Sequence, residues 1–389
     1  MTRPPSPHVS LGTIAREWGR LGCVGFGGPP THIALLRRMC VEERGWMEAQ
    51  EFEDGIAAAN LLPGPASTQL AIYCAWRLRG PIGGILGGLC FIVPGLVLIT
   101  ALAALFLLRH PPDWILGAAA GAGAAVPAVA LSAAWGLSPA SWKRIGTARA
   151  QRIRWAGYAL LGGAAAALIG AYLVLVIVAC GLVEILIRVR GRAAPARATP
   201  GLFATLAVRT AAVGGLGALA WVAFKVGALS YGGGFVIVPL MQHDAVSTYR
   251  WMTGSQFLSA VALGQVTPGP VVQTVAVVGY AAAGVGGALL AAAVAFAPSF
   301  VFVLGGAPHF QQIRSSSVVQ SFLTGAGPSV IGAIAGSAIP LGLALQHLWQ
   351  VPLLAAALLW FLALRRGVVS GLLIAGAVGV VVALAGVAV

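Results

Sequence analysis

Acidic residues are scarce in this chain, which has 10 Asp and Glu residues against 24 Lys and Arg residues. Charged residues make up 9% of the 389 positions, hydrophobic residues make up 59%, and the mean hydropathy is +0.90. A water-soluble domain has too little interior to bury so large an apolar share. The composition therefore excludes a soluble globular protein and predicts an integral membrane protein surrounded by a lipid bilayer.

The sequence also lacks the motifs of several kinds of chemistry. Its five cysteines show no Cys-x-x-Cys spacing and its six histidines form no His-x-x-His or His-Glu-x-x-His pair, so neither a disulfide framework nor a zinc site is predicted. A Walker A sequence is missing, which argues against a built-in ATPase. Pro4, Pro5 and Pro7 stand where a cleavable signal peptide has its apolar core. We expect no metal, no cofactor and no enzyme activity, with a membrane-embedded enzyme as the weaker alternative.

The formal net charge of +14 would suggest a nucleic-acid partner in a soluble protein. Here the basic residues sit between apolar runs instead of forming a basic domain of their own. Loops rich in Arg and Lys mark the cytoplasmic side of membrane proteins. We therefore predict a multi-pass protein of the bacterial inner (plasma) membrane with no nucleic-acid partner.

One unusual segment occurs twice in the chain. Each member of the first copy has its counterpart 205 residues later, and the match needs no gap between Gly22 and Gln69. Two Gly/Pro-broken apolar segments, one in each half, point to a transporter whose substrate site lies between two repeats. The counterparts are Gly27-Gly28 and Gly232-Gly233, Trp46-Met47 and Trp251-Met252, Phe52 and Phe257, and Pro63-Gly64-Pro65 and Pro268-Gly269-Pro270.

The distribution of Arg and Lys predicts that the two repeats are inverted in the membrane. In the first half, basic loops around Arg77 and at 143–154 flank apolar runs, and the run at 155–187 suits two short spans that turn near Gly170. In the second half, the loops at 279–287 and 342–351 have no Lys or Arg, whereas Arg314 and Arg365-Arg366 mark the alternating loops. We expect an all-α polytopic membrane protein with inverted-topology repeats, broken or re-entrant helices at the Gly/Pro motifs, and roughly 9–13 membrane segments.

An additional apolar run at 201–221 precedes the second copy and supplies the odd span that turns this copy over. The stretch Ala-Pro-Ala-Arg-Ala-Thr-Pro at 194–200 is typical of an exposed linker. The expected organisation is a first repeat at residues 1–190, a linker with an extra transmembrane span at 191–222, and a second, inverted repeat at 223–389.

The repeated Gly/Pro motifs predict helix starts inside the bilayer. Glycines and prolines break a helix, and proline also fits the first turn of a new one. Lipid cannot satisfy the free N–H groups of a helix start, so such backbone must be buried in protein or line a water-filled cavity, where the N–H groups favour anions. We therefore predict an oxyanion site built from both copies, at Gly27, Gly28, Asn60, Gly64, Ser67, Thr68, Gln69, Gly232, Gly233, Gln265, Gly269, Gln273 and Thr274.

A basic residue lies just upstream of the glycine break in each copy, Arg20 in the first and Lys225 in the second. Cations within apolar segments suit a site that holds an oxyanion between two half-helices. The alternative is that both side chains snorkel to the membrane interface and that the glycines only let helices pack closely.

These motifs together resemble the long, two-domain chromate ion transporters. The resemblance rests on Phe-Gly-Gly-Pro at 26–29, Glu-Arg-Gly-Trp at 43–46, Leu-Pro-Gly-Pro at 62–65 and Thr-Pro-Gly-Pro at 267–270, and it covers nearly the whole chain. It implies export of chromate from the cytoplasm and chromate resistance, with sulfate as a mimic of the same shape and charge. The second copy departs from the first at Gly234, which replaces Pro29, and at 247–250, which leaves Glu42 and Glu43 outside the internal symmetry.

The direction of transport has a physical basis as well. A dianion that leaves a negative interior gains roughly twice the 2.3 kcal/mol that one charge gains per 100 mV. Ion coupling would need a titratable group in the path, and Glu43 and Glu184 are the candidates, although Glu43 suits a solvated turn and Glu184 suits pairing with a neighbouring Arg. Sulfate or another inorganic anion remains open as the substrate, as does assembly into a homodimer.

Overall fold

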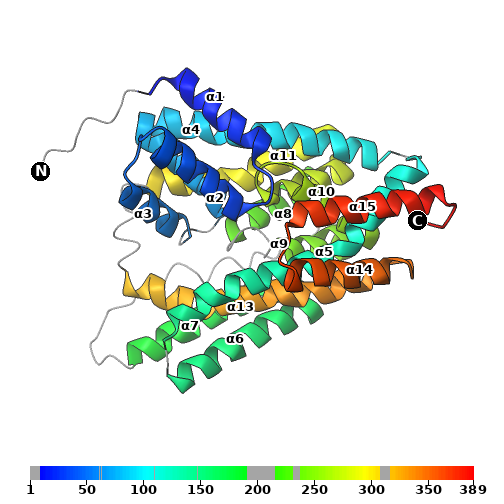
Figure 1. Cartoon of the computed structure of the whole chain (residues 1–389). Coiled ribbons are helices and arrows are strands. Elements are labelled where there is room, and N and C mark those ends of the chain that lie inside the picture. Colours follow the sequence, from blue (N-terminus) through cyan, green and yellow to red (C-terminus); the bar gives the residue numbers. More distant parts are fainter. Residues whose placement is uncertain are drawn as a thin grey trace, which may run out of the picture.

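The computed structural model describes residues 9–60, 62, 64–108, 110–146, 148–190, 215–230, 237–306 and 316–389, and every regular element within them is helical (Figure 1). The expected all-α membrane fold is confirmed, because α4, α5, α11 and α13 are long and apolar enough to cross a bilayer. The helices are α1 Leu11–Val24, α2 Pro29–Arg37, η1 Arg38–Glu43, α3 Ala49–Ala59, α4 Ala66–Phe106, α5 Asp113–Arg144, α6 Arg149–Leu168, η2 Gly170–Tyr172, α7 Leu173–Arg190, α8 Leu216–Leu229, α9 Ile237–Gln242, η3 His243–Thr248, α10 Gly254–Val266, η4 Val271–Gln273, α11 Thr274–Gly306, α13 Ser317–Leu343, α14 Gln350–Leu358, η6 Leu359–Ala363 and α15 Val368–Leu384.

The helices themselves repeat along the chain. Both bounds of α8 lie 205 residues after those of α1, and both bounds of η3 lie 205 residues after those of η1. The elements η1 and η3 are π-helices, a rare form that occurs frequently at functional sites. The internal sequence repeat is thus also a repeat of local structure.

The long elements α4 and α11 are each a hairpin of two helical legs. Gly80 (φ 59°, ψ −154°) turns α4, and Gly284 (φ 63°, ψ −153°) turns α11. Only glycine adopts such angles without strain, because it has no Cβ. The legs then pack on each other: Gly83 lies against the Ala75 carbonyl, and Gly287 lies against Gly279. A first leg of about 20 Å, residues 66–78, therefore starts deep in the protein and returns as a leg of about 40 Å, residues 81–106. Whether these hairpins are the re-entrant helices expected at the Gly/Pro motifs stays a prediction.

The two hairpin turns correct one detail of the sequence match. They lie 204 residues apart and not 205, so a gap is needed after the Pro-Gly-Pro motif. The second copy absorbs the missing residue in the tight 3₁₀ turn of η4, where the first copy already has α-helix. Gln69 therefore corresponds to Gln273 and not to Thr274.

The remaining helices form a layer beside these hairpins. Helix α13 packs against α5, α6 and α7, and α15 packs against α5 (Figure 1). The approach of α13 to α6 is close, because Gly162 lies against the backbone of Ser329 and Gly332 lies against that of Ala159. The predicted turn near Gly170 (φ 29°) is confirmed between α6 and α7.

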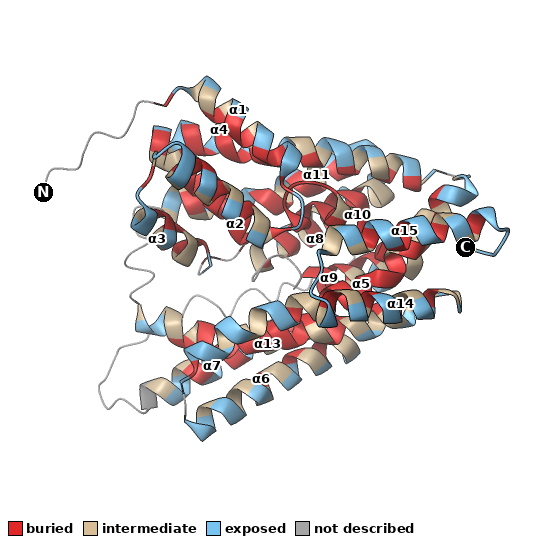
Figure 2. Ribbon diagram, in the orientation of Figure 1, coloured by how far each residue is buried: buried red, intermediate tan, exposed pale blue. Residues whose placement is uncertain are grey.

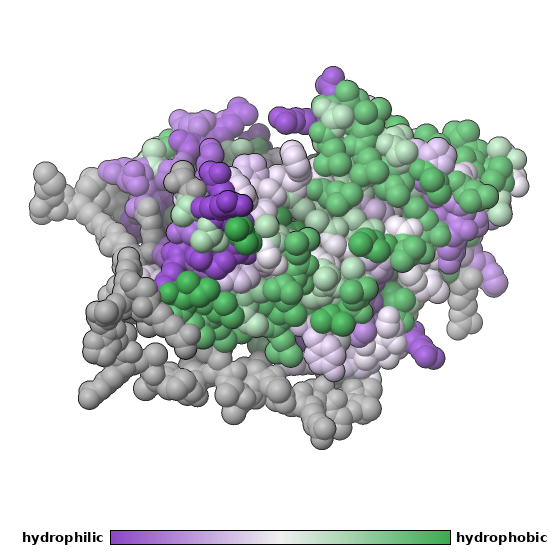
Figure 3. Space-filling view, turned by 90° about the horizontal axis from the view of Figure 1, so that it is seen from below, coloured by the Kyte–Doolittle hydropathy of each residue, from purple (hydrophilic) through white to green (hydrophobic). Residues whose placement is uncertain are grey.

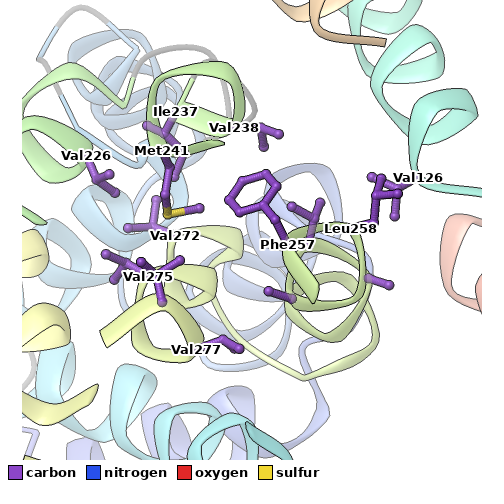
Figure 4. Close-up of a cluster of buried hydrophobic side chains, with 14 of the residues drawn as sticks. Val126, Val226, Ile237, Val238, Met241, Phe257, Leu258, Val272, Val275 and Val277 are labelled. Atoms are coloured by element: carbon purple, nitrogen blue, oxygen red, sulfur yellow. The ribbon is translucent and has the colours of Figure 1, made fainter. Parts of the chain in front are cut away.

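The largest apolar core lies where α5, α8, α10, α11 and α13 meet. Figure 4 shows part of it, with Ile237 and Met241 of α9 beside Phe257 of α10. Helix α10 is buried along most of its length, whereas α6, α7, α14 and α15 alternate between buried and exposed residues, as in Figure 2. Such exposed apolar faces suit lipid contact.

Most of the hydrophilic residues on the face seen in Figure 3 gather toward the ends of the molecule, with hydrophobic residues between them. This pattern suits a bilayer that surrounds the middle of the protein. Residues 191–214, which hold most of the predicted linker and additional span, lie outside the described residues. Helix α8 begins at Leu216, ahead of the boundary expected at 222/223, and the division into three parts stays a prediction.

Candidate functional site

The Gly/Pro breaks of the two copies meet and exchange backbone hydrogen bonds. The Gly64 N–H donates to the Ser230 carbonyl (2.9 Å), and the Gly269 N–H donates to the Gly25 carbonyl (2.8 Å). The two bonds are equivalent under the internal repeat, since Gly64 and Gly269 are counterparts and so are Gly25 and Ser230. In each case the Pro-Gly-Pro segment of one copy is held by the end of the first helix of the other copy. We call this pair of contacts, Gly64 with Ser230 and Gly269 with Gly25, the crossing. It needs both halves of the chain.

A helix starts at each side of this crossing without a side-chain cap. Helix α4 begins at Ala66 and the second hairpin begins at Val271, and neither Pro65 nor Pro270 supplies a capping side chain. The first N–H groups of a helix have no partner within it. The residues that carry these N–H groups are buried, so both starts place donors and the positive end of a helix dipole inside the protein.

Buried polar side chains surround the crossing. Several of them have an oxygen or nitrogen atom with no hydrogen-bond partner among the described residues. Buried polar atoms are nearly always paired, so a group of unpaired atoms indicates a place for a ligand or for water. The atoms are Oγ of Ser67, Ser230 and Ser299, Oγ1 of Thr68, Nε2 of Gln265 and Oε1 of Gln273.

Gln273 connects the crossing to the long leg of the opposite hairpin. Its Nε2 donates to the Ile92 carbonyl (2.8 Å), and its side chain lies against Gly95, where a Cβ would collide with it. In the other copy, a Cβ on Gly64 would collide with the Gln69 amide and lie 3.0 Å from Ser299 Oγ. Each glutamine therefore packs close to the glycine of its own Pro-Gly-Pro motif.

The structure brings most of the predicted site residues together. They are buried and lie in or beside the two helix starts: Gly28, Gly64, Ser67, Thr68, Gln69, Gly269, Gln273 and Thr274. Thr274 uses its hydroxyl to bond the Val271 carbonyl (2.8 Å). Gly28 faces the second helix start, since a Cβ there would lie 3.6 Å from Val271.

Other predicted residues differ between the copies or cannot be placed. Gly27 and Asn60 of the first copy are exposed, whereas Gln265, the counterpart of Asn60, is buried. Gly232 and Gly233 lie outside the described residues. The site is thus asymmetric in exposure although its backbone is symmetric.

The two predicted cations have different surroundings. Lys225 binds Asp244 of η3 through a 2.5 Å ion pair and lies 5.8 Å from the centre of the Trp221 ring. Arg20 is exposed and makes no ion pair among the described residues. A contact of either cation with the substrate stays a prediction.

The candidate coupling carboxylates are both engaged in ion pairs. Glu43 binds Arg38 at 2.7 Å on the surface, as expected of a solvated turn. Glu184 is 2% exposed in its side chain and binds Arg154 (3.0 Å) and Arg188 (2.9 Å), with the Tyr158 hydroxyl as a further donor. This double pairing favours the structural interpretation of Glu184, which ties α7 to α6.

Three residues at the crossing were missed by the sequence reasoning. Ser230 could have been found as the counterpart of Gly25 at the 205-residue spacing. Ser299 corresponds to Gly95 after the one-residue gap, and no pattern in the sequence marks it. His32 lies just after the first Gly/Pro motif, but a single histidine outside any metal-binding spacing gave no signal.

Comparison with known proteins gives a consistent result along the chain. The family model of the chromate transporters matches residues 12–185 and 217–387. A probable chromate transport protein of Synechococcus elongatus is 31% identical over 343 residues, which cover 86% of this chain and 86% of that protein. The chromate transport protein of Cupriavidus metallidurans is 32% identical over 346 residues, 86% of this chain and 84% of that protein. The chromate transport protein of Pseudomonas aeruginosa is 30% identical over 355 residues, 87% of this chain and 83% of that protein. No solved structure matches significantly.

Proposed function

Because this chain belongs to the chromate transporter family, we propose that it exports chromate, or a sulfate-like divalent oxyanion, from the cytoplasm and thereby gives resistance to chromate. Family members are transport proteins, so the chain is a multi-pass transporter of the inner membrane and not an enzyme. Substrate preference, direction and energy source are parts of the proposal.

The exchanged hydrogen bonds at Gly64 and Gly269 carry this proposal. They bring two uncapped helix starts to one place, where N–H groups and neutral side chains can replace the water around a tetrahedral anion. Pairing the substrate with dipoles instead of a full set of cations keeps binding weak enough for release. The site residues named above are therefore proposed to bind the oxyanion, with Arg20 and Lys225 adding long-range attraction.

We further propose that the repeats have inverted topology and that the first repeat opens toward the cytoplasm. The contact of His243, at the start of η3, with Gly170 supports inversion. It places η3 beside the turn that joins α6 and α7. Arg149 and Arg188 lie near the opposite ends of these two helices, which are the ends proposed to be cytoplasmic, so η3 lies on the other side. Equivalent helices are packed unequally: α10 packs against α5, α11 and α15, whereas the extensive packing of α3 among the described residues is with α4. Unequal burial of equivalent elements supports a carrier that is closed on one side and open on the other.

Export needs no built-in chemical energy source in this scheme. A dianion that leaves a cell with a potential of 100 mV, negative inside, gains about 4.6 kcal/mol, which corresponds to a concentration ratio of more than a thousandfold. Membrane potential, ion coupling or both would thus drive export.

Counterflow in proteoliposomes tests the function and its alternative together. Purified protein is reconstituted, the vesicles are loaded with unlabelled sulfate, and the entry of labelled sulfate is measured with external unlabelled sulfate, chromate, molybdate, phosphate or nitrate as competitor. Chromate should compete at least as well as sulfate, while the planar monovalent nitrate should compete poorly. Competition by sulfate alone would make the protein a sulfate transporter of the same architecture. Preference for nitrate would contradict the proposed divalent site.

A further inference from the structure

His32 lies directly beside the crossing, in the first turn of α2. The residue is 1% exposed, and its Nε2 forms a 2.9 Å hydrogen bond with the Gly25 carbonyl. The same carbonyl accepts the Gly269 N–H of the second copy. His32 and the helix break of the other repeat therefore share one acceptor.

The second ring nitrogen of His32 has no partner among the described residues. A carbonyl oxygen can only accept a hydrogen bond, so Nε2 carries the hydrogen of the neutral ring and Nδ1 is a bare acceptor. Nδ1 is buried and unpaired, and the edge-to-face contact of the ring with Phe91 supplies no donor. Nδ1 is therefore the position at which this ring would bind a proton.

The charged and titratable groups on the helices packed against α2 do not pair with His32. Helix α1 contributes Glu17, which is paired with Arg16 and Arg44, and Arg20, which is exposed. None of the described groups forms an ion pair or hydrogen bond with His32. The groups on these elements are Arg16, Glu17, Arg20 and Cys23 of α1, Arg37 of α2, Arg38, Cys40, Glu42 and Glu43 of η1, and Tyr73, Cys74, Arg77, Arg79 and Cys90 of α4.

We propose that His32 takes up a proton when the oxyanion binds and releases it when the oxyanion leaves. The inference rests on the proposed function. A proton from water forms the N–H bond at Nδ1 on binding, and the reverse step returns it to water. A buried imidazolium without a counter-charge is unfavourable, and the dianion supplies that charge, so each species favours the other. His32 is thereby a substrate-linked protonation site, with one proton taken up for each anion bound.

The second repeat has no such group, because the counterpart of His32 is Ile237. Its side chain is fully buried in the apolar cluster of Figure 4. A single protonation site at the crossing gives an uptake of one proton per anion bound. Once protonated, His32 supplies a positive charge beside groups of the crossing that are otherwise neutral.

Isothermal titration calorimetry of the purified protein with sulfate tests the inference. Sulfate stays a dianion at neutral pH, whereas chromate itself takes up a proton there. Titrations at one pH in two buffers with different ionisation enthalpies count the protons taken up on binding. Between the pH at which free His32 titrates and the higher pH at which it titrates with sulfate bound, wild-type protein should take up one proton, and its sulfate affinity should fall by up to about tenfold per pH unit.

His32→Gln should bind sulfate with no proton uptake and with an affinity that does not depend on pH, since the amide can still donate to the Gly25 carbonyl but cannot be protonated. His32→Ile, which copies the second repeat, is the second variant. His347→Gln is the matched control, because His347 stacks on Trp349 far along the chain from the crossing, and it should behave as wild type. Proton uptake that persists in a folded His32 variant would overturn the inference.

The wild-type measurement decides the matter even if neither His32 variant folds. Sulfate binding without proton uptake would refute the role of His32 and leave the proposed transport intact. A wild-type protein that binds and transports neither sulfate nor chromate would refute the proposed function itself.

Discussion

The glycine of the first Pro-Gly-Pro motif should be irreplaceable for transport, and the structure gives the size of the effect. Gly64 has φ +129°, and a Cβ there would collide with the Gln69 amide and approach Ser299 Oγ to 3.0 Å. Gly64→Ala therefore carries a backbone cost of about 1–3 kcal/mol and also displaces Gln69 from the helix start. Each 1.4 kcal/mol lost from the binding-competent arrangement is about tenfold in affinity, so transport should fall by at least about tenfold.

Gly80 provides the matched control for this substitution. It also has a positive φ, +59°, at the turn of the same hairpin, but a Cβ there would meet open space. Gly80→Ala should lower Tm by an amount similar to Gly64→Ala while retaining sulfate counterflow per folded protein. Counterflow in proteoliposomes and thermal unfolding of the purified proteins measure the two effects. Equal losses of counterflow in both variants, or full counterflow in Gly64→Ala, would refute the reasoning.

Three further outcomes are expected. In a variant whose native cysteines have been replaced, an impermeant thiol reagent should label Lys143→Cys from the cytoplasmic side and Gln346→Cys from the opposite side. Labelling of both positions from one side would contradict the inverted topology. Lys225→Gln should lower Tm by leaving Asp244 unpaired, and adding Asp244→Asn should restore Tm. Arg20→Gln should leave Tm unchanged and weaken sulfate binding about tenfold, and an unchanged sulfate affinity would return Arg20 to the membrane interface. Glu184→Gln should lower Tm by leaving Arg154 and Arg188 without their counter-charge. Counterflow per folded protein and the pH dependence of counterflow should not change. A shifted pH dependence of counterflow would instead support Glu184 as a coupling carboxylate.

Much of the local structure could be predicted from the sequence because glycine and proline act locally. The prolines at 29–30 and at 65 mark where α2 and α4 begin, and the apolar run at 155–187 turns at Gly170 as its length required. The helical hairpins were not specified in this way. A run from 83 to 108 fits one span equally well, and the return of the chain at Gly80 depends on the packing of Gly83 on Ala75, which periodicity does not encode.

The composition of the site was partly predictable for the same reason. The 205-residue spacing marked both Pro-Gly-Pro segments, and these do meet. It did not mark that each segment bonds the first helix of the opposite copy, because a repeat in sequence does not distinguish packing within a copy from exchange between copies. The exposure of Asn60 and the burial of Gln265 likewise follow from how far α3 and α10 are packed, a property of the conformation and not of either residue.

The exchange at the crossing has a consequence for how the protein is made. The Gly25 carbonyl leaves the ribosome well before Gly269, and synthesis at about 5–20 residues per second separates them by roughly 10–50 s. During that interval the first half stands in the membrane with its helix start at Ala66 complete in sequence but lacking the Ser230 carbonyl that anchors Gly64. The nascent first half is thus an open form that the second half must close, and an interruption of synthesis between the repeats would leave a membrane-inserted product without a finished centre.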